Sequence, residues 1–336
     1  MARLDLRRLE RIVDGFRSVR LLVMGDVVLD EYLWGEVERI SPEAPVPVVH
    51  VRDETTVLGG AANAARNVVA LGGAADCCAI VGDDIAGRRV LELLKDLGID
   101  PDGLVQDPSR PTTRKSRVIA RSQQVVRFDR ETDQPPEPGV AREVLKRLEG
   151  LATRADGAIL EDYGKGLLAR RLASAAMKRL LAAGLPVAVD PKSDLGPYRG
   201  AALLKPNLGE AARLAGIEVR SRDDLVRAAA RLRRKIGGGA LVVTRGSAGM
   251  SLFEDDGEGV DVRTPPREIF DVQGAGDTAI AALTLSLRAG ASLYEAAIIS
   301  NAASGIVVGK VGTATASADE LKAALPAALA AAQGRA

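Results

Sequence analysis

Short apolar runs alternate with longer segments of helical periodicity along most of the chain. Such runs are typical of strands that are buried on both faces of a parallel sheet. The predicted strands cover residues 20–25, 76–81, 157–160, 186–190, 201–204 and 240–244. The predicted helices cover residues 61–71, 85–97, 167–183, 208–215, 223–235 and 318–336. This alternation predicts an α/β fold in which helices cover both faces of a mainly parallel sheet.

Two segments do not fit that scheme. Residues 45–52 and 112–129 alternate apolar and polar positions, as strands with one face in water do. We interpret both as a small antiparallel β flap, inserted at about residues 36–52 and 111–130. The proline-rich residues 133–139 are predicted to be a surface linker. On this interpretation residues 1–336 form a single domain, although the length alone also allows two.

The charges of the chain almost cancel. Lys and Arg number 46 and Asp and Glu 45, so the net charge is +1. This argues against binding of nucleic acid through bulk charge and leaves a local phosphate site open. Residues 1–20 are charged throughout and have no apolar stretch of signal-peptide length. Because no run of about 18 apolar residues occurs, we expect no membrane span.

Cysteine and histidine narrow the chemistry further. Cys77 and Cys78 are adjacent in a predicted buried strand, which predicts core thiols in a reducing cytosol and a cytoplasmic protein. His50 is the single histidine of the chain, so zinc sites rich in histidine and H-E-x-x-H helices are excluded. It lies in an alternating segment, where we expect a solvent-facing strand residue.

The most informative stretch is DVQGAGDTA, residues 271–279, which is followed by a proline-free run typical of a helix. A turn at Gly274, Ala275 and Gly276 that opens a helix presents unpaired backbone N–H groups at the positive end of the helix dipole. Such a turn can stabilise the charge of a transferring phosphoryl group. Asp277, beside it, could then take a proton from a substrate hydroxyl. The stretch alone is equally compatible with an ordinary glycine turn and a first-turn helix acid.

A second glycine turn precedes the predicted helix 61–71. Gly59 and Gly60 would let the backbone approach a sugar hydroxyl closely, and Asn63 could donate to and accept from neighbouring hydroxyls. A tight strand-to-helix turn with Asn63 on the surface fits the spacing as well. Asp26 and Asp30 follow the first strand, at the sheet edge where ligands of open α/β sheets bind. Asp30 could instead cap the segment that follows it.

The two glycine turns together resemble the signatures of the ribokinase-like (PfkB) carbohydrate kinases, and the resemblance extends over residues 21–315. Within that family the segments GDVVLD at 25–30, RISPEAPVPV at 39–48 and DYGKG at 162–166 resemble kinases of heptose 7-phosphate. The bifunctional members of that group carry a second, nucleotidyltransferase domain with a two-histidine motif. We therefore expect the kinase part alone in this chain.

The resemblance implies a three-layer ribokinase-like fold with a β lid, and a homodimer formed through that lid. It implies ATP and Mg²⁺ as cofactors and a sugar phosphate as substrate. The implied reaction phosphorylates the C1 hydroxyl of D-glycero-D-manno-heptose 7-phosphate to heptose 1,7-bisphosphate, on the route to ADP-heptose and the lipopolysaccharide core. The alternatives are a kinase of a hexose, a nucleoside or a fructose phosphate, and a non-catalytic sugar- or nucleotide-binding protein of the same fold.

The resemblance also assigns roles to single residues. Asp277 becomes the base, and Gly274, Ala275 and Gly276 become the anion hole. The implied substrate-binding residues are Asp26, Asp30, Gly59, Gly60, Asn63, Arg121, Asp162 and Lys165. Other candidate partners of the substrate phosphate are Arg114, Lys115, Arg117 and Arg127. The implied ATP-binding residues are Lys192, Asn207, Glu210, Thr244, Gly246, Gly249 and Asn301.

Two details of the ATP and cation sites remain open at this point. Asn207 and Glu210 match an Asn-x-x-Glu motif in which Glu210 helps to hold Mg²⁺ through water, but Asn207 could simply cap the helix that starts at Leu208. Gln273 stands where the family usually has Thr or another small residue. This departure leaves open a monovalent-cation site near Asp271, which the family otherwise implies.

Overall fold

The computed structural model describes residues 5–121, 123–254, 257–265, 270–310 and 312–334. Within these residues the main sheet has nine strands in the order β13-β12-β11-β10-β9-β8-β1-β4-β5. All neighbours from β11 to β5 are parallel, and β12 and β13 are added antiparallel at one edge. The predicted α/β fold with a mainly parallel central sheet is confirmed.

The strands of the main sheet are β1 (Arg20–Gly25), β4 (Ala74–Gly82), β5 (Leu104–Asp107), β8 (Gly157–Glu161), β9 (Val187–Asp190), β10 (Leu203–Leu204), β11 (Ala240–Thr244), β12 (Met250–Phe253) and β13 (Val260–Val262). The helices are α1 (Leu6–Gly15), α2 (Ala61–Ala70), α3 (Ile85–Asp96), α4 (Pro138–Ala152), α5 (Arg170–Ala182), α6 (Leu208–Ala215), α7 (Arg222–Ile236), α8 (Ala275–Arg288), α9 (Leu293–Val308) and α10 (Ala318–Ala332).

The predicted elements agree with these bounds to within a few residues. β10 keeps only two of the four predicted residues, and β4 is three residues longer than predicted. The helix predicted at 318–336 is α10, and residues 335–336 lie outside the described residues. The sequence pattern did not predict α1, α4, β5, β12 or β13.

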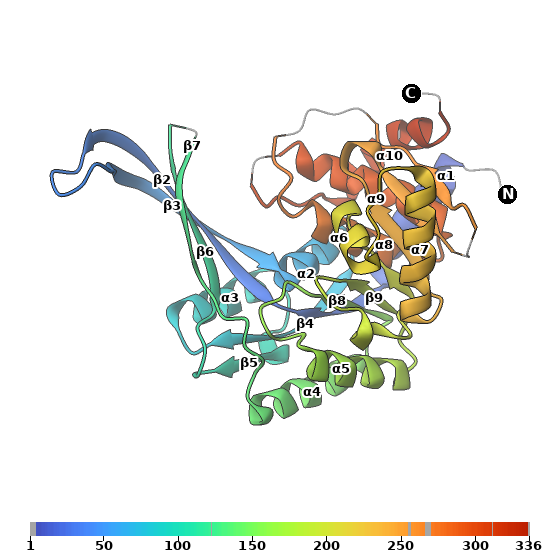
Figure 1. Cartoon of the computed structure of the whole chain (residues 1–336), viewed down its shortest axis with the longest axis horizontal. Helices are drawn as coiled ribbons and strands as arrows, with labels where there is room; N and C mark the ends of the chain where they lie inside the picture. Colours follow the sequence, from blue (N-terminus) through green and yellow to red (C-terminus); the bar gives the residue numbers. More distant parts are fainter. Residues whose placement is uncertain (1–4, 122, 255–256, 266–269, 311, 335–336) are drawn as a thin grey trace.

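The helices form two layers around the sheet (Figure 1). α8 and α9 pack against each other and, with α1, α2 and α10, form one layer, while α4 and α5 lie on the opposite side. Ten consecutive residues of α8, from Asp277 to Ser286, are buried. A helix that is buried all round needs small and apolar residues on every face, and the sequence of α8 supplies them. The first turn of α8 is therefore anchored in the body of the molecule.

A second, four-stranded sheet projects from the body of the molecule (Figure 1). Its strands are β2 (Val27–Ile40), β3 (Pro47–Gly60), β6 (Thr113–Ala120) and β7 (Gln123–Arg130), in the order β3-β2-β6-β7. The outer pairings are antiparallel, as expected for the flap, whereas β2 pairs with β6 in parallel. β2 and β3 are longer than the predicted flap strands because they continue down to the main sheet. His50 is exposed on β3, as predicted.

Two smaller predictions can also be compared with the structure. Cys77 and Cys78 are both buried on β4 and are not disulfide-bonded. Burial raises the pKa of the Cys77 thiol to about 12, so it is an unreactive core thiol. Among the described residues, no helix is long and apolar enough to span a membrane.

Candidate active site

The turn before α8 has a backbone that only glycine adopts readily. Gly274 is the N-cap of α8 and has a φ of 75°, in the left-handed region. A Cβ at this position would also lie 2.9 Å from Nδ2 of Asn63, which is too close. No side chain caps the helix, and the first-turn N–H of Ala275 makes only a long bond to the backbone oxygen of Val272 at 3.4 Å. The role of this turn as an anion hole stays a prediction.

Asp277 lies in that first turn and is only 3% exposed. Its carboxylate receives hydrogen bonds from two sides. Asn63 Nδ2, on α2, donates to Oδ2 at 2.6 Å, and the Tyr163 hydroxyl donates to Oδ1 at 2.5 Å. Burial raises the pKa of Asp277, and the two donors oppose that rise because they stabilise the charged form. Asp277 is thus a buried carboxylate with specific partners and not an ordinary exposed helix acid.

Asn63 is fixed by a chain of buried polar groups that links α2 to α8. The Thr278 hydroxyl donates to Asn67 Oδ1 at 2.8 Å, and Asn67 Nδ2 donates to the backbone oxygen of Asn63 at 2.9 Å. Asn67 and Thr278 were not predicted as site residues. The spacing of four residues between Asn63 and Asn67 puts both on one face of α2, and this signal could have found Asn67.

Asp26 lies at the end of β1 and is fully engaged with the loop that follows β8. Its Oδ2 accepts the backbone N–H groups of Tyr163 at 3.1 Å and Lys165 at 2.9 Å. Its Oδ1 accepts the N–H of Leu167 at 3.0 Å. Asp26 was predicted to contact a sugar hydroxyl directly. The contacts that the structure shows for it position the DYGKG loop, residues 162–166, and the sugar contact stays a prediction.

Asp30 does not cap a helix. It lies on β2, and its Oδ1 is 2.6 Å from Arg117 on β6 in a buried ion pair. The Arg117 guanidinium also lies over the ring of Tyr32, 5.3 Å from its centroid. The Tyr32 hydroxyl donates to Oε1 of Gln273 at 2.9 Å, so β2 is connected directly to the turn before α8. Gly59 faces Asp30, since a Cβ there would lie 2.4 Å from Asp30 Oδ2.

Arg121 is placed away from these groups. It is exposed in the turn between β6 and β7, with a φ of 48°, and donates to the backbone oxygen of Val37 at 3.0 Å. Arg117, four residues earlier and roughly 13 Å along the strand, is the residue of this strand that reaches Asp30. The structure therefore does not bring Arg121 to Asp277 and its partners Asn63 and Tyr163. The sequence could not separate the two arginines because both lie in one alternating segment.

The other basic candidates on the projecting sheet all have acidic neighbours. Arg114 lies 3.4 Å from Glu31, and Lys115 lies 4.0 Å from Asp129. Lys165, in the DYGKG loop, pairs with Glu131 at 2.7 Å. The backbone N–H of Lys165 is bound by Asp26, which also binds the N–H of Tyr163. Because the Tyr163 hydroxyl contacts Asp277, Lys165 belongs to the loop that contacts Asp277. A substrate phosphate at Lys165 would replace Glu131 as its partner.

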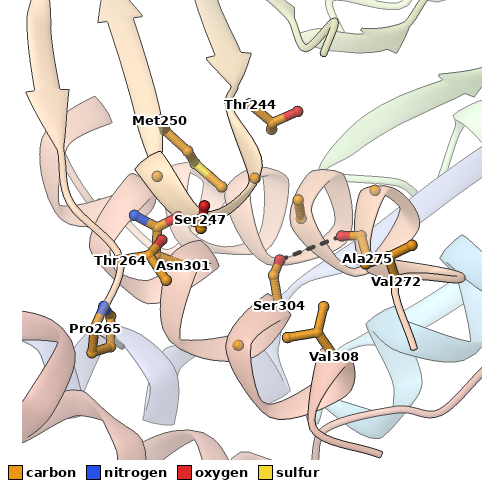
Figure 2. Close-up of a pocket in the computed structure, with 15 residues that line it drawn as sticks. Thr244, Ser247, Met250, Thr264, Pro265, Val272, Ala275, Asn301, Ser304 and Val308 are labelled. Carbon is orange, nitrogen blue, oxygen red and sulfur yellow. Dashed lines mark hydrogen bonds between the residues drawn. The ribbon is translucent and has the colours of Figure 1, made fainter. Parts of the chain in front are cut away.

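A cavity of about 340 Å³ lies beside the turn (Figure 2). Its size is that of a small-molecule site. Four predicted nucleotide-binding residues line it, namely Thr244, Gly246, Gly249 and Asn301. Ala275 and Gly276 also line it, so it reaches the first turn of α8. The remaining lining residues are Ser247, Met250, Thr264, Pro265, Val272, Ala279, Ser304, Gly305 and Val308.

Lys192, Asn207 and Glu210 do not line this cavity. Asn207 is the N-cap of α6: its Oδ1 accepts the N–H of Glu210, and Glu210 Oε2 accepts the N–H of Asn207 at 3.0 Å. Asn207 therefore caps the helix, and its role at the nucleotide stays a prediction. Glu210 Oε1 lies 4.0 Å from Nζ of Lys192 in a long ion pair.

Three charged residues at the ends of β8, β9 and β10 were not predicted. Lys205 and Asp190 form an ion pair at 2.7 Å, and Lys205 is only 2% exposed. Glu161 is buried, and neither of its carboxylate oxygens has a hydrogen-bond partner among the described residues. Burial raises the pKa of Glu161 well above its usual range, and Asp190 adds to that rise. Each residue lies at or directly after the carboxyl end of a predicted apolar strand. Ligands of open α/β sheets bind at these ends, so this position could have identified the three residues.

Comparison with known proteins agrees with this geometry. The profile of the pfkB family carbohydrate kinases matches residues 20–320. The chain belongs to this family. Membership implies the use of ATP and a divalent cation by a sugar kinase.

Two curated relatives in the family show how far the similarity extends. The bifunctional protein HldE of Desulfatibacillum aliphaticivorans is 45% identical over 311 residues, which are 92% of this chain and 64% of that protein. The bifunctional protein HldE of Paramagnetospirillum magneticum is 45% identical over 323 residues, 96% of this chain and 66% of that protein. The chain thus spans about two thirds of the length of these relatives.

Solved structures of the pfkB-like fold superpose over nearly the whole chain. Arabidopsis thaliana ribokinase, complexed with ribose and ATP, has a TM-score of 0.72 at 20% identity and covers 91% of this chain and 98% of its own. Escherichia coli phosphofructokinase-2, in complex with potassium, has a TM-score of 0.75 at 21% identity and covers 93% and 99%. At these identities the similarity shows the ribokinase-like fold alone.

The acidic residues of this pfkB kinase fit a Mg²⁺ ion that is bound with the nucleotide. In the part of the chain that is described, no three Asp, Glu, His or Cys side chains form a metal site. Mg²⁺ at kinase sites, however, is commonly held by one or two carboxylates, water and substrate phosphates. The oxygens of Glu161, which have no hydrogen-bond partner among the described residues, and Glu210 Oε1, which has only Lys192 at 4.0 Å, suit that kind of coordination.

The predicted monovalent-cation site is less well supported. Asp271 accepts the N–H of Gln273 through Oδ1 at 2.9 Å and the N–H of Gly312 through Oδ2 at 3.2 Å. Both carboxylate oxygens thus already stabilise the backbone around the turn. A cation near Asp271 stays a prediction.

Proposed function

We propose that the chain is an ATP- and Mg²⁺-dependent kinase that phosphorylates the C1 hydroxyl of D-glycero-D-manno-heptose 7-phosphate. The product would be heptose 1,7-bisphosphate, on the route to ADP-heptose and the lipopolysaccharide core. One observation carries the reaction type. Gly276 lines a cavity of about 340 Å³, and the next residue, Asp277, presents a buried carboxylate to Asn63 and Tyr163.

The proposed mechanism is an in-line transfer of the γ-phosphoryl group from ATP in the cavity to the acceptor beside Asp277. Asp277 accepts the proton of the anomeric hydroxyl while the oxygen of that hydroxyl attacks the γ-phosphorus, the bond from the γ-phosphorus to the β–γ bridging oxygen breaks, and ADP leaves. The backbone N–H groups of Gly274, Ala275 and Gly276 stabilise the charge on the transferring phosphoryl group. Lys205 Nζ adds a positive charge directly behind Gly276. Mg²⁺, when bound with ATP, neutralises charge on the β and γ phosphates.

The substrate is proposed on two grounds. The segments at 39–48 and 162–166 resemble kinases of heptose 7-phosphate, and the relatives that are about 45% identical are bifunctional HldE proteins. The acceptor is proposed to lie between Gly59, Gly60 and Asn63 on one side and Asp162 and Lys165 on the other. Lys165 then binds the phosphate that the sugar already carries.

A homodimer through the lid, the four-stranded sheet, is part of the proposal. β7 is exposed along its length and carries Val126 and Phe128, each 49% exposed. Ile40 and Val51, at the outer end of β2 and β3, are 60% and 44% exposed. Exposed apolar residues gathered on one projecting sheet are typical of an interaction surface.

ATP-dependent release of ADP in the presence of Mg²⁺ tests the proposal. The acceptors are heptose 7-phosphate, fructose 6-phosphate, ribose and adenosine, and the Asp277→Asn variant serves as the blank. Turnover confined to heptose 7-phosphate supports both the chemistry and the substrate. Turnover on another acceptor alone keeps the kinase mechanism and removes the heptose assignment, and no turnover on any acceptor favours a binding protein.

A further inference from the structure

Asp277 has a hydroxyl partner that no glycine-turn signature accounts for. The Tyr163 hydroxyl donates to Oδ1 at 2.5 Å, opposite the Asn63 amide on Oδ2. Tyr163 does not belong to α2 or α8 but to the DYGKG loop after β8. The carboxylate is therefore held between a helix and a loop that approach it from different parts of the fold.

The loop is built so that it holds Tyr163 in this position. Asp26 binds the N–H group of Tyr163 itself and those of Lys165 and Leu167. Gly164 and Gly166 have φ values of 69° and 94°, which a side chain would strain. A Cβ on Gly166 would lie 2.1 Å from the backbone oxygen of Gln134.

Asp162 holds the start of the same loop. Its Oδ1 accepts the N–H of Gly164 at 2.9 Å, and its Oδ2 accepts the Tyr198 hydroxyl at 3.0 Å. The sequence DYGKG thus supplies two turn glycines and an acidic anchor around one tyrosine. Together these contacts hold the loop so that the Tyr163 hydroxyl points to Asp277.

Because of the charges around Asp277, the Tyr163 hydroxyl is important for keeping Asp277 in its charged form. The titratable groups that face it are Asp30, Glu161, Tyr163, Asp190 and Lys205. Three of them are carboxyls, which together with burial favour the protonated form of Asp277. Only Lys205 and the two hydrogen-bond donors favour the charged form. Burial raises the pKa of Tyr163 well above its usual value, so Tyr163 stays a neutral donor.

We propose that Tyr163 is a positioning residue of the kinase, whose hydroxyl holds the Asp277 carboxylate ionised and correctly oriented to receive the acceptor's proton. Asp26 acts one step further out, because it positions the loop and through it Tyr163. This inference rests on the proposed function. To the proposed mechanism it adds Tyr163, which lies outside the two glycine turns and on which the base Asp277 depends.

The pH profile of kcat/KM for the acceptor, measured for Tyr163→Phe and the wild type, tests the proposal. Phenylalanine keeps the ring and removes only the donor, so the pKa of Asp277 should rise. The acidic limb of the profile should then move upward by about one pH unit, with about a tenfold loss on that limb. KM for ATP should not change, because Tyr163 does not line the nucleotide cavity.

Tyr198→Phe is the matched control. It also removes a hydroxyl from a carboxylate of the same loop, but that carboxylate is Asp162. Its acidic limb should stay at the wild-type pH. A Tyr163→Phe limb that coincides with the wild-type limb would overturn the inference, and so would an equal shift in both variants, since that indicates a general loosening of the loop.

A second measurement does not depend on turnover and so separates this inference from the proposed function. In protein labelled with ¹³C at the aspartate carboxyls, the Asp277 signal is assigned from its absence in Asp277→Asn. Its titration in Tyr163→Phe should move to higher pH than in the wild type. If the wild type phosphorylates no acceptor but this shift is seen, the proposed function fails and the role of Tyr163 on Asp277 stands. An unshifted Asp277 titration overturns the role of Tyr163.

Discussion

Lys205 and Asp190 form a buried ion pair directly behind Gly276. The Lys205 Nζ is 2.7 Å from Asp190 Oδ2. The two atoms lie 3.7 and 3.9 Å from the point where a Cβ on Gly276 would be. The pair therefore supports the turn that we assign to the phosphoryl group and places the Lys205 ammonium next to it, with its partner carboxylate at a similar distance.

Replacing Lys205 by Met should impair both stability and turnover. Loss of the ammonium leaves Asp190 without its cation, which should lower the free energy of unfolding by about 3 kcal/mol. Chemical denaturation and kcat are the measurements. The double variant Lys205→Met with Asp190→Leu should recover stability but not kcat, since the charge behind Gly276 stays absent. Recovery of full kcat in the double variant would contradict a role for Lys205 in transfer.

The Asp277→Asn substitution should abolish proton acceptance while keeping the shape of the site. We expect kcat to fall by about 10²–10⁴-fold, the range of a lost general base. ATP affinity, measured by isothermal titration calorimetry, should stay near the wild-type value because Asp277 does not line the cavity. Wild-type turnover in this variant would exclude Asp277 as the base.

Gly274→Ala should disturb the turn in two ways. The left-handed φ of 75° costs a residue with a Cβ about 1–2 kcal/mol, and the added Cβ also meets Asn63 Nδ2 at 2.9 Å. Gly290→Ala is a matched control, because Gly290 has a φ of 88° and no atom within 4 Å of an added Cβ. The unfolding free energy should fall more in Gly274→Ala than in Gly290→Ala, and kcat should fall only in Gly274→Ala. Equal effects on both would refute the contact with Asn63.

Glu161→Gln should change how stability depends on pH. The pKa of Glu161 is raised in the folded state by burial and by Asp190, so the folded state binds its proton more tightly than the unfolded state. The stability contributed by that proton is lost as pH rises above about 4, the unfolded value. The variant should therefore gain stability relative to the wild type from pH 5 to pH 8, measured by thermal unfolding without divalent cation. Glu218→Gln, at an exposed position, controls for loss of one charge, and a pH-independent difference would contradict the assignment.

Phe128→Asp should dissociate the proposed homodimer. Phe128 is half exposed on β7, so a carboxylate there is tolerated in a monomer but not in an apolar interface. Sedimentation velocity should show a dimer for the wild type and a monomer for the variant. Ile85→Asp, which changes another exposed apolar residue on α3, should leave the assembly unchanged. A monomeric wild type would exclude the dimer.

The extent to which sequence could anticipate the site differs from residue to residue. Gly274 was predictable because a backbone of positive φ beside a helix start restricts the residue type itself. The cap at Asn207 and Glu210 was predictable for a similar reason, since its partners are three residues apart. Arg117 and Arg121 were not distinguishable, because the choice between them depends on which one meets Asp30 across a strand pairing.

The long-range partners were beyond the reach of sequence patterns. Tyr163 and Asp277 are 114 residues apart, and Asn63 and Asp277 are 214 apart. Neither pair has a spacing that local geometry could reveal. Asp26 shows the same limit, because its three acceptor contacts go to a loop that starts more than 130 residues later, and no local pattern links the two segments.

By itself the sequence determined the strand–helix alternation, the parallel sheet and the two glycine turns, because each depends on local periodicity or on the φ that one residue can adopt. The tertiary structure alone decided what the turns face. It brought Asn63, Tyr163 and Lys205 to the first turn of α8 and put the cavity beside it. The reason is that side chains from distant segments meet only after the strands are ordered in the sheet, and a strand order is set by packing across the whole chain and not by any one stretch of it.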